Sequence, residues 1–118
     1  MPTLQMRWLG LLVASANLTS ACRPRAPEIG RDLPTNIKEA SEIFDARVKA
    51  VYQQGTSEER LVVDLRNQGF VSSPKHGDWN LASFNDNKLF MASRWSVAWR
   101  AENGRIVSIG GRYDLLAP

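Results

Sequence analysis

The chain contains little cysteine and little histidine, with one residue of each among its 118. A single cysteine forms no disulfide within the chain, and a single histidine cannot complete a multi-histidine metal site. We therefore expect neither a disulfide-stabilised miniprotein nor a metal site, and no cofactor. The length limits the chain to one small domain, which excludes a large multidomain enzyme.

The chain also has no large excess of charge of one sign, because its 15 lysines and arginines are nearly balanced by 12 aspartates and glutamates. The basic residues are scattered along the chain and interleaved with acidic ones. Proteins that bind nucleic acid usually concentrate their basic residues in one stripe or patch. The sequence therefore predicts no nucleic-acid partner.

A long hydrophobic run is missing as well. The apolar stretch over residues 8–18 is shorter than the roughly 20 residues that a membrane-spanning helix needs. It has the length of the central region of a signal peptide, follows the basic Arg7, and precedes the small residues Ser20 and Ala21. We predict a signal peptide over residues 1–21, cleaved before Cys22.

The sequence Leu-Thr-Ser-Ala-Cys that ends at Cys22 resembles the lipobox of bacterial lipoproteins. The resemblance implies that Cys22 becomes the N-terminus and carries lipid such as palmitate, which anchors the protein in a membrane. Arg23 replaces the aspartate of the inner-membrane sorting signal, which implies the outer membrane, facing the periplasm. The alternative is conventional cleavage, which leaves Cys22 as an ordinary residue.

The segment that follows Cys22 is rich in proline. Residues 23–34 contain three prolines and alternating charges but few apolar side chains, which predicts an extended tether. We therefore divide the mature chain into a lipid-bearing tether over residues 22–35 and a small domain over residues 36–118.

Two helices are expected at the start of this domain. Asn36 provides an N-cap with Glu39 three residues later, and Gly55 ends the first helix. A capping box from Thr56 to Glu59 opens a second, short helix, and Gly69 lies just past its end. Apolar residues at helical spacing form the buried stripes of the two helices. They are Ile37, Ala40, Phe44, Val48 and Val51 in the first helix and Leu61, Val62 and Leu65 in the second.

From Phe70 onward the apolar spacing becomes two, which indicates strands. We expect a polar loop over residues 72–78 and a turn over residues 85–87. Strands are expected over residues 79–84, 89–101 and 105–113. The adjacent glycines 110 and 111 lie in the last strand and predict a close backbone approach or a bulge.

The turn at residues 102–104 decides which side chains face each other. A two-residue Asn-Gly turn would set Trp99 opposite Ser108, whereas a three-residue loop with Gly104 as the bulge residue sets Trp99 opposite Val107. We favour the three-residue loop, because it places large apolar residues on one face. That face, which we predict to be core rather than a ligand surface, carries Trp95, Val97, Trp99, Val107, Ile109 and Tyr113.

The predicted fold class is α+β, with two N-terminal helices packed on one face of a three- to four-stranded antiparallel sheet. Several features resemble the SmpA/OmlA (BamE-like) envelope lipoproteins and the related β-lactamase-inhibitor-protein fold. They are the turn over residues 55–59, the helix end near Gly69, the late Trp-x-x-x-Trp strand and the glycine hairpin. The resemblance implies a scaffold or inhibitor style of function.

Groups suited to catalysis are few. His76 is the one candidate general base, and it lies near Ser72, Ser73 and Asp78 in the expected polar loop. A Ser-His-Asp set normally requires rigidly supported side chains from separate parts of a fold. We therefore predict that the protein is not an enzyme, with no catalytic residue.

A candidate partner surface is formed by Trp79, Arg94, Arg100 and Arg112. The three arginines alternate with the predicted core residues, so they belong to the opposite face of the sheet. Arginine is enriched at protein interfaces, so this face could bind an acidic partner. We favour the other interpretation, an ordinary solvated face of the sheet.

Three functions are compatible with the sequence. The leading one is a non-enzymatic, membrane-tethered envelope lipoprotein that acts as a protein-interaction or scaffold module, with an unidentified envelope protein as partner. The alternative is a periplasmic inhibitor or immunity protein that binds a hydrolase or toxin. The third, a small enzyme that uses His76, is the weakest.

Overall fold

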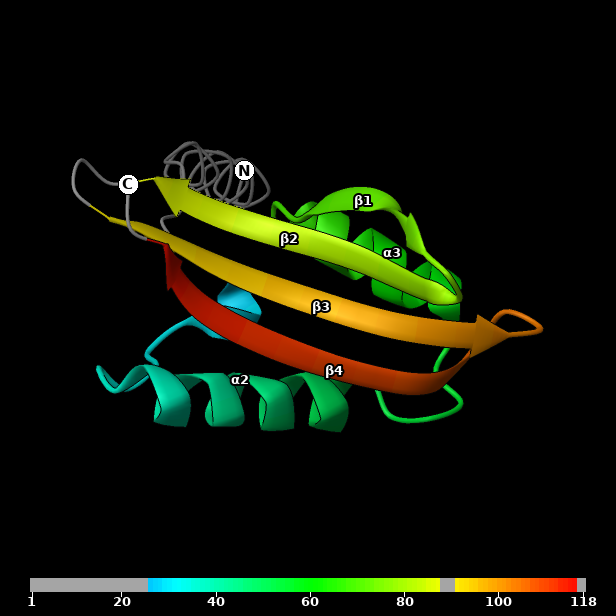
Figure 1. Ribbon diagram of the computed structural model, residues 1–118. Coiled ribbons are helices and arrows are strands. Elements are labelled where there is room, and N and C mark those ends of the chain that lie inside the picture. The colour runs from blue at the N-terminus through cyan, green and yellow to red at the C-terminus, as the bar shows by residue number, and fades with distance from the viewer. Residues whose placement is uncertain (1–25, 88–90, 117–118) are drawn as a thin grey trace, which may run out of the picture.

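A computed structural model describes residues 26–87 and 91–116, which form two α-helices and a four-stranded antiparallel sheet (Figure 1). The α+β class is as predicted. The sheet order is β1-β2-β3-β4, so every strand pairs with its neighbour in sequence. The elements are η2 (Glu28–Gly30), α2 (Ile37–Val51), α3 (Glu58–Asn67), β1 (Val71–His76), β2 (Trp79–Asn87), β3 (Ala92–Glu102) and β4 (Arg105–Leu116).

Helix α2 begins where its cap predicts. The Asn36 side-chain oxygen accepts a hydrogen bond from the Glu39 backbone N–H at 3.0 Å. The buried stripe is shorter than predicted, because Ile37 and Val51 at the two helix ends are exposed. Tyr52, just past the helix, is buried instead. The middle of the stripe, Ala40, Phe44 and Val48, is fully buried as expected.

Helix α3 begins one residue later than predicted, so the capping box at Thr56 is wrong. Ser57 is the N-cap, and its hydroxyl accepts from the Arg60 N–H at 3.4 Å. The Thr56 backbone carbonyl accepts a hydrogen bond from the Ile106 N–H at 2.9 Å. The pairing of Thr56 with β4 sets where the helix starts.

The end of α3 confirms the role of Gly69. Its φ of +100° lies in the left-handed region, where glycine is favoured. The Gly69 N–H donates to the Arg66 carbonyl at 3.0 Å, and the Phe70 N–H donates to the Leu65 carbonyl at 2.9 Å. This pair of hydrogen bonds is the Schellman motif, which satisfies the last carbonyls of a helix and turns the chain toward β1.

The segment before α2 differs from the expected extended tether. Residues 26–34 pack against the domain, with η2 as a short helical turn and partly buried apolar side chains against the core. The Ile29 N–H donates to the Gln68 side chain at 2.9 Å, and the Arg47 guanidinium donates to the Ile29 carbonyl at 3.4 Å. Composition alone missed this docking, because the backbone of the segment is hydrogen-bonded by two distant side chains, Arg47 of α2 and Gln68 just past α3.

Two segments predicted as a loop and a turn are strands. Residues 71–76 form β1, and the predicted turn over 85–87 belongs to β2. Every residue of β1 is exposed, and β1 is an edge strand, which is where a sheet tolerates Pro74 and consecutive polar residues. The true turn is Gly77-Asp78, with Gly77 at a φ of +60°.

The β3–β4 hairpin corrects the predicted three-residue loop. Its turn has two residues, Asn103 and Gly104, both with positive φ, as a type I′ turn requires. A bulge then interrupts the pairing, and Trp99 lies opposite Ile109. The extra residue at Val107 shifts the register by one, so large apolar side chains still face each other. The two-residue register that we did not favour holds for the pairs between the turn and the bulge, and the favoured three-residue register holds for none.

One buried cluster joins the helices to the sheet. Trp95 is 5% exposed and Trp99 is 3% exposed, which confirms that both belong to the core. Ile106 takes the place predicted for Val107, because the bulge turns Ile106 inward. The cluster consists of Phe44, Val48, Tyr52, Leu61, Leu65, Phe70, Ala82, Phe84, Trp95, Val97, Trp99 and Ile106.

Helix α2 also covers the outer edge of β4. The Gly111 N–H donates to the Asp45 carboxylate at 2.9 Å, and the Tyr113 N–H donates to the Ser41 hydroxyl at 3.1 Å. A Cβ atom on Gly111 would lie 2.9 Å from a methyl group of Val48, which confirms the predicted close approach. Backbone donors of an edge strand are thereby hydrogen-bonded within the domain and blocked from pairing with another chain.

Tyr52 makes stability fall at high pH. Burial, together with the neighbouring Asp64, raises the pKa of Tyr52 to about 12. The unfolded chain ionises near pH 10 while the folded state keeps its proton, so stability present below pH 10 is lost as the pH rises toward 12. We expect a loss of about 2 kcal/mol by pH 11.5 in urea unfolding. The Tyr52→Phe variant should not show this loss of stability between pH 10 and 12. An identical pH dependence of the unfolding free energy in both proteins would show that Tyr52 does not cause the loss.

Candidate partner-binding face

The outer face of the sheet is formed by the residues of β2, β3 and β4 that alternate with the core residues. Three rows of side chains cross it. The rows are Leu81–Ala98–Gly110, Ser83–Ser96–Arg112 and Asn85–Arg94–Asp114, and Trp79, Arg100 and Ser108 extend the face toward the β3–β4 turn.

An aromatic residue and a cation lie together at the turn end of the outer face. Trp79 is 39% exposed, although it is a large apolar residue. The Arg100 guanidinium carbon lies 5.2 Å from the centre of the Trp79 ring, which is a cation–π contact. The contact holds two flexible side chains in one arrangement while both stay accessible.

The middle of the outer face is apolar and hollow. Leu81, Ala98 and Gly110 lie directly opposite one another on three adjacent strands. Because alanine and glycine have little side chain, the surface sinks into a depression of about 460 Å³ between Trp79 and Arg112. The depression has room for an apolar side chain of a partner.

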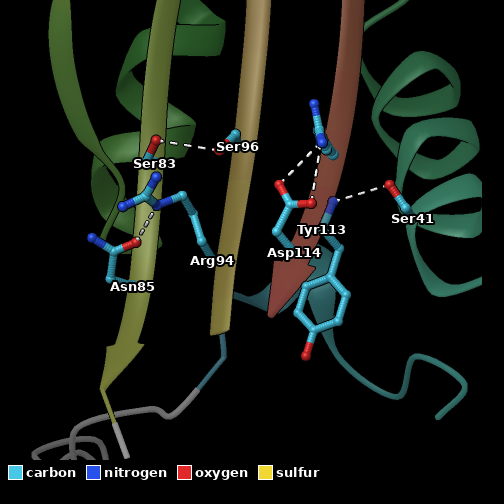
Figure 2. A network of polar contacts seen from close by, with 8 residues as sticks. Ser41, Ser83, Asn85, Arg94, Ser96, Tyr113 and Asp114 are labelled. Atoms are coloured by element: carbon cyan, nitrogen blue, oxygen red, sulfur yellow. Dashed lines mark hydrogen bonds and ion pairs between the residues drawn. The ribbon is translucent and has the colours of Figure 1, made fainter. Parts of the chain in front are cut away.

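The other end of the outer face carries two anchored arginines (Figure 2). Arg94 donates through Nε to the Asn85 side-chain oxygen at 3.0 Å. Arg112 uses its Nε on the Asp114 carboxylate, at 3.2 and 3.0 Å from the two oxygens. Within residues 26–87 and 91–116, the terminal nitrogens of these two guanidinium groups donate no hydrogen bond. Those nitrogens are available to a ligand.

The four residues predicted as a partner surface share this face but lie at its two ends. Trp79 and Arg100 are at one end, and Arg94 and Arg112 are at the other. The sequence interpretation missed the contributions of Leu81 and the rest of β2, because it did not determine how β2 pairs with β3. The alternation Trp79, Leu81, Ser83, Asn85 was the signal that could have revealed them.

The candidate catalytic loop is a strand. His76 lies on the exposed edge strand β1 with Ser72 and Ser73. In the described part of the chain, no hydrogen bond joins His76 to a serine or to Asp78, and no three His, Cys, Asp or Glu side chains are grouped to hold a metal ion. Cys22, the predicted lipid attachment site, lies outside the described residues.

Comparison with known proteins adds no relative. No family model, no curated protein and no solved structure matches the chain. None of the helices described between residues 26 and 116 is long and apolar enough to cross a membrane.

Proposed function

We propose that the protein is a membrane-tethered envelope lipoprotein that acts as a non-enzymatic protein-interaction module. In this proposal α2 and α3 together close one face of the sheet, and the outer face binds the partner. The observation that carries it is the outer face itself, where an exposed Trp79 and Arg112 line an apolar depression and Arg94 and Arg100 lie on the same face.

The composition of the outer face supports binding of a protein. Tryptophan and arginine dominate the residues that contribute most to interface affinity, and such residues surround well-packed apolar centres. Here the Trp79–Arg100 contact keeps both side chains in place before a partner arrives. Ordering two side chains in advance lowers the entropy cost of association.

Because residues 26–34 pack against the domain, the proposed tether is shorter than the one predicted from the sequence. If Cys22 carries the lipid, only residues 23–25 separate it from Ala26, which packs against the core. Four residue steps span at most about 14 Å. The proposed anchor therefore holds the domain close to the membrane surface, whereas the extended segment expected from the sequence would hold it away.

The intact mass of the mature protein tests the anchor. We expect a species that starts at Cys22, carries added acyl mass and remains in the membrane fraction. Cys22→Ser should lose the acyl mass and leave the membrane. An unmodified soluble wild-type species would contradict the anchor and favour the periplasmic inhibitor.

Partner enrichment with a matched pair of variants tests the interaction. Leu81→Asp places a charge in the apolar depression, whereas Val63→Asp places one on the exposed side of α3. We expect the first variant to lose the proteins that co-purify with wild type and the second to keep them, with both variants folded by circular dichroism. Equal recovery with both variants would contradict the outer face as the binding surface.

A further inference from the structure

We infer that the partner of the outer face is an extended acidic segment of a protein, with an apolar side chain between two acidic ones. This inference rests on the proposed function, because it specifies what the outer face binds. Three features of the outer face support it: its charge, the orientation of its arginines and the distance between its two ends.

The charge of the outer face is positive. Between the two ends it carries the guanidinium groups of Arg94, Arg100 and Arg112 and the carboxylate of Asp114, which is already paired with Arg112. Arg94 is held by a neutral amide and Arg100 by an aromatic ring, so neither charge is neutralised. Complementary charge steers association and rejects partners of the same sign, which favours an acidic ligand.

The two anchored arginines are prepared for carboxylates. Each guanidinium uses Nε on a neighbouring side chain, and each keeps its pair of terminal nitrogens for a ligand. A carboxylate accepts two parallel hydrogen bonds from such a planar fork. Arg94 leans toward β2 through Asn85 and Arg112 stays on β4 beside Asp114, so the two guanidinium groups flank β3 and each can receive an acidic group.

The distance between the two cationic ends determines the length of the ligand. Arg94 and Arg100 are six residues apart on β3, which corresponds to about 20 Å along a strand. An extended segment of about seven residues covers that distance. The first, third, fifth and seventh side chains of such a segment point to the same side, so the third or the fifth, depending on the direction of the segment, lies over the depression at Leu81 and Ala98, where an apolar group is favoured.

A defined peptide tests this pattern. The probe is a seven-residue peptide with glutamate at its first and last positions, leucine at the third and fifth, and serine or threonine elsewhere, so that all four side chains point to one side of the extended chain. A second peptide carries lysine in place of both glutamates. Each is titrated to millimolar concentration into the isotope-labelled full chain with Cys22→Ser, and the indole N–H signal of Trp79, assigned with Trp79→Phe, is followed by NMR.

We expect the glutamate peptide to move the Trp79 signal and the lysine peptide to leave it in place. The double variant Arg94→Glu and Arg112→Glu should bind the glutamate peptide about tenfold more weakly, whereas Lys38→Glu on the exposed side of α2 should bind it as wild type does. Phosphatidylglycerol vesicles should not compete for the face.

Three results would overturn the inference: no shift at millimolar peptide, equal binding of the two peptides, or vesicle binding that is lost in the double variant. If partner enrichment still depends on Leu81 in any of these cases, the proposed function stands and only the acidic pattern is wrong. If enrichment does not depend on Leu81, the outer face is not the binding surface and both fail.

Discussion

Trp99→Ala is expected to lower the free energy of unfolding by about 3–5 kcal/mol, measured by urea denaturation. The side chain is 3% exposed and packs in the cluster that joins α3 to the sheet. Its indole N–H also donates to the Glu58 carboxylate at 2.8 Å, so truncation removes both the packing and a charge-assisted hydrogen bond.

The matched control for this loss is Trp79→Ala. Trp79 is the same residue type but is exposed on the outer face, so its truncation should cost only about 1 kcal/mol. Similar losses for the two variants would mean that burial does not separate the tryptophans, and the division into a core face and an outer face would be wrong.

Gly111→Leu should cost about 3 kcal/mol, because a side chain at this position collides with α2. A Cβ atom there would lie 2.9 Å from Val48 and 3.0 Å from the Phe44 ring, both fully buried and unable to move aside. The hydrogen bond from the Gly111 N–H to Asp45 holds the helix at this distance. The added side chain can be accommodated only if α2 moves away from β4.

Gly110→Ala is the matched control for the close approach. A Cβ atom on Gly110 would meet only one oxygen of the Asp45 carboxylate, at 3.2 Å, a contact that a shift of a few tenths of an ångström relieves. We expect the change in unfolding free energy to stay within about 1 kcal/mol. If Gly111→Leu were as stable as Gly110→Ala, the packing of α2 on β4 would be wrong.

Local signals predicted local features correctly. The Asn36 cap and the Gly69 helix end depend on residues within three or four positions of each other, and both have the predicted geometry. The burial of Trp95 and Trp99 followed from alternation along one strand. Such features need no knowledge of which segments meet in space.

Features that depend on distant segments were missed. The bulge at Val107 depends on the pairing of β3 with β4, and the start of α3 depends on the hydrogen bond between Thr56 and Ile106. The docking of residues 26–34 depends on Gln68 and Arg47, which lie far along the chain. Residue preferences within these segments carried no information about those partners.

In the candidate site, too, features set by one strand were predicted and features that need several strands were missed. Alternation along β3 predicted that Arg94 and Arg100 lie on one face, and the structure places them there. The depression between them requires Leu81, Ala98 and Gly110 from three strands, and its existence followed only from the pairing. The hydrogen bonds that orient Arg94 and Arg112 were likewise outside the reach of the sequence pattern.

Site-specific photocrosslinking in cells tests the central claim most directly. A photoreactive phenylalanine analogue is placed at Ser96, in the middle of the outer face, or at Ala46, on the exposed side of α2. The account predicts a discrete crosslinked adduct from Ser96 and none from Ala46. An adduct from Ala46 alone, or none from either position in the native membrane, would contradict the claim that the outer face binds a partner.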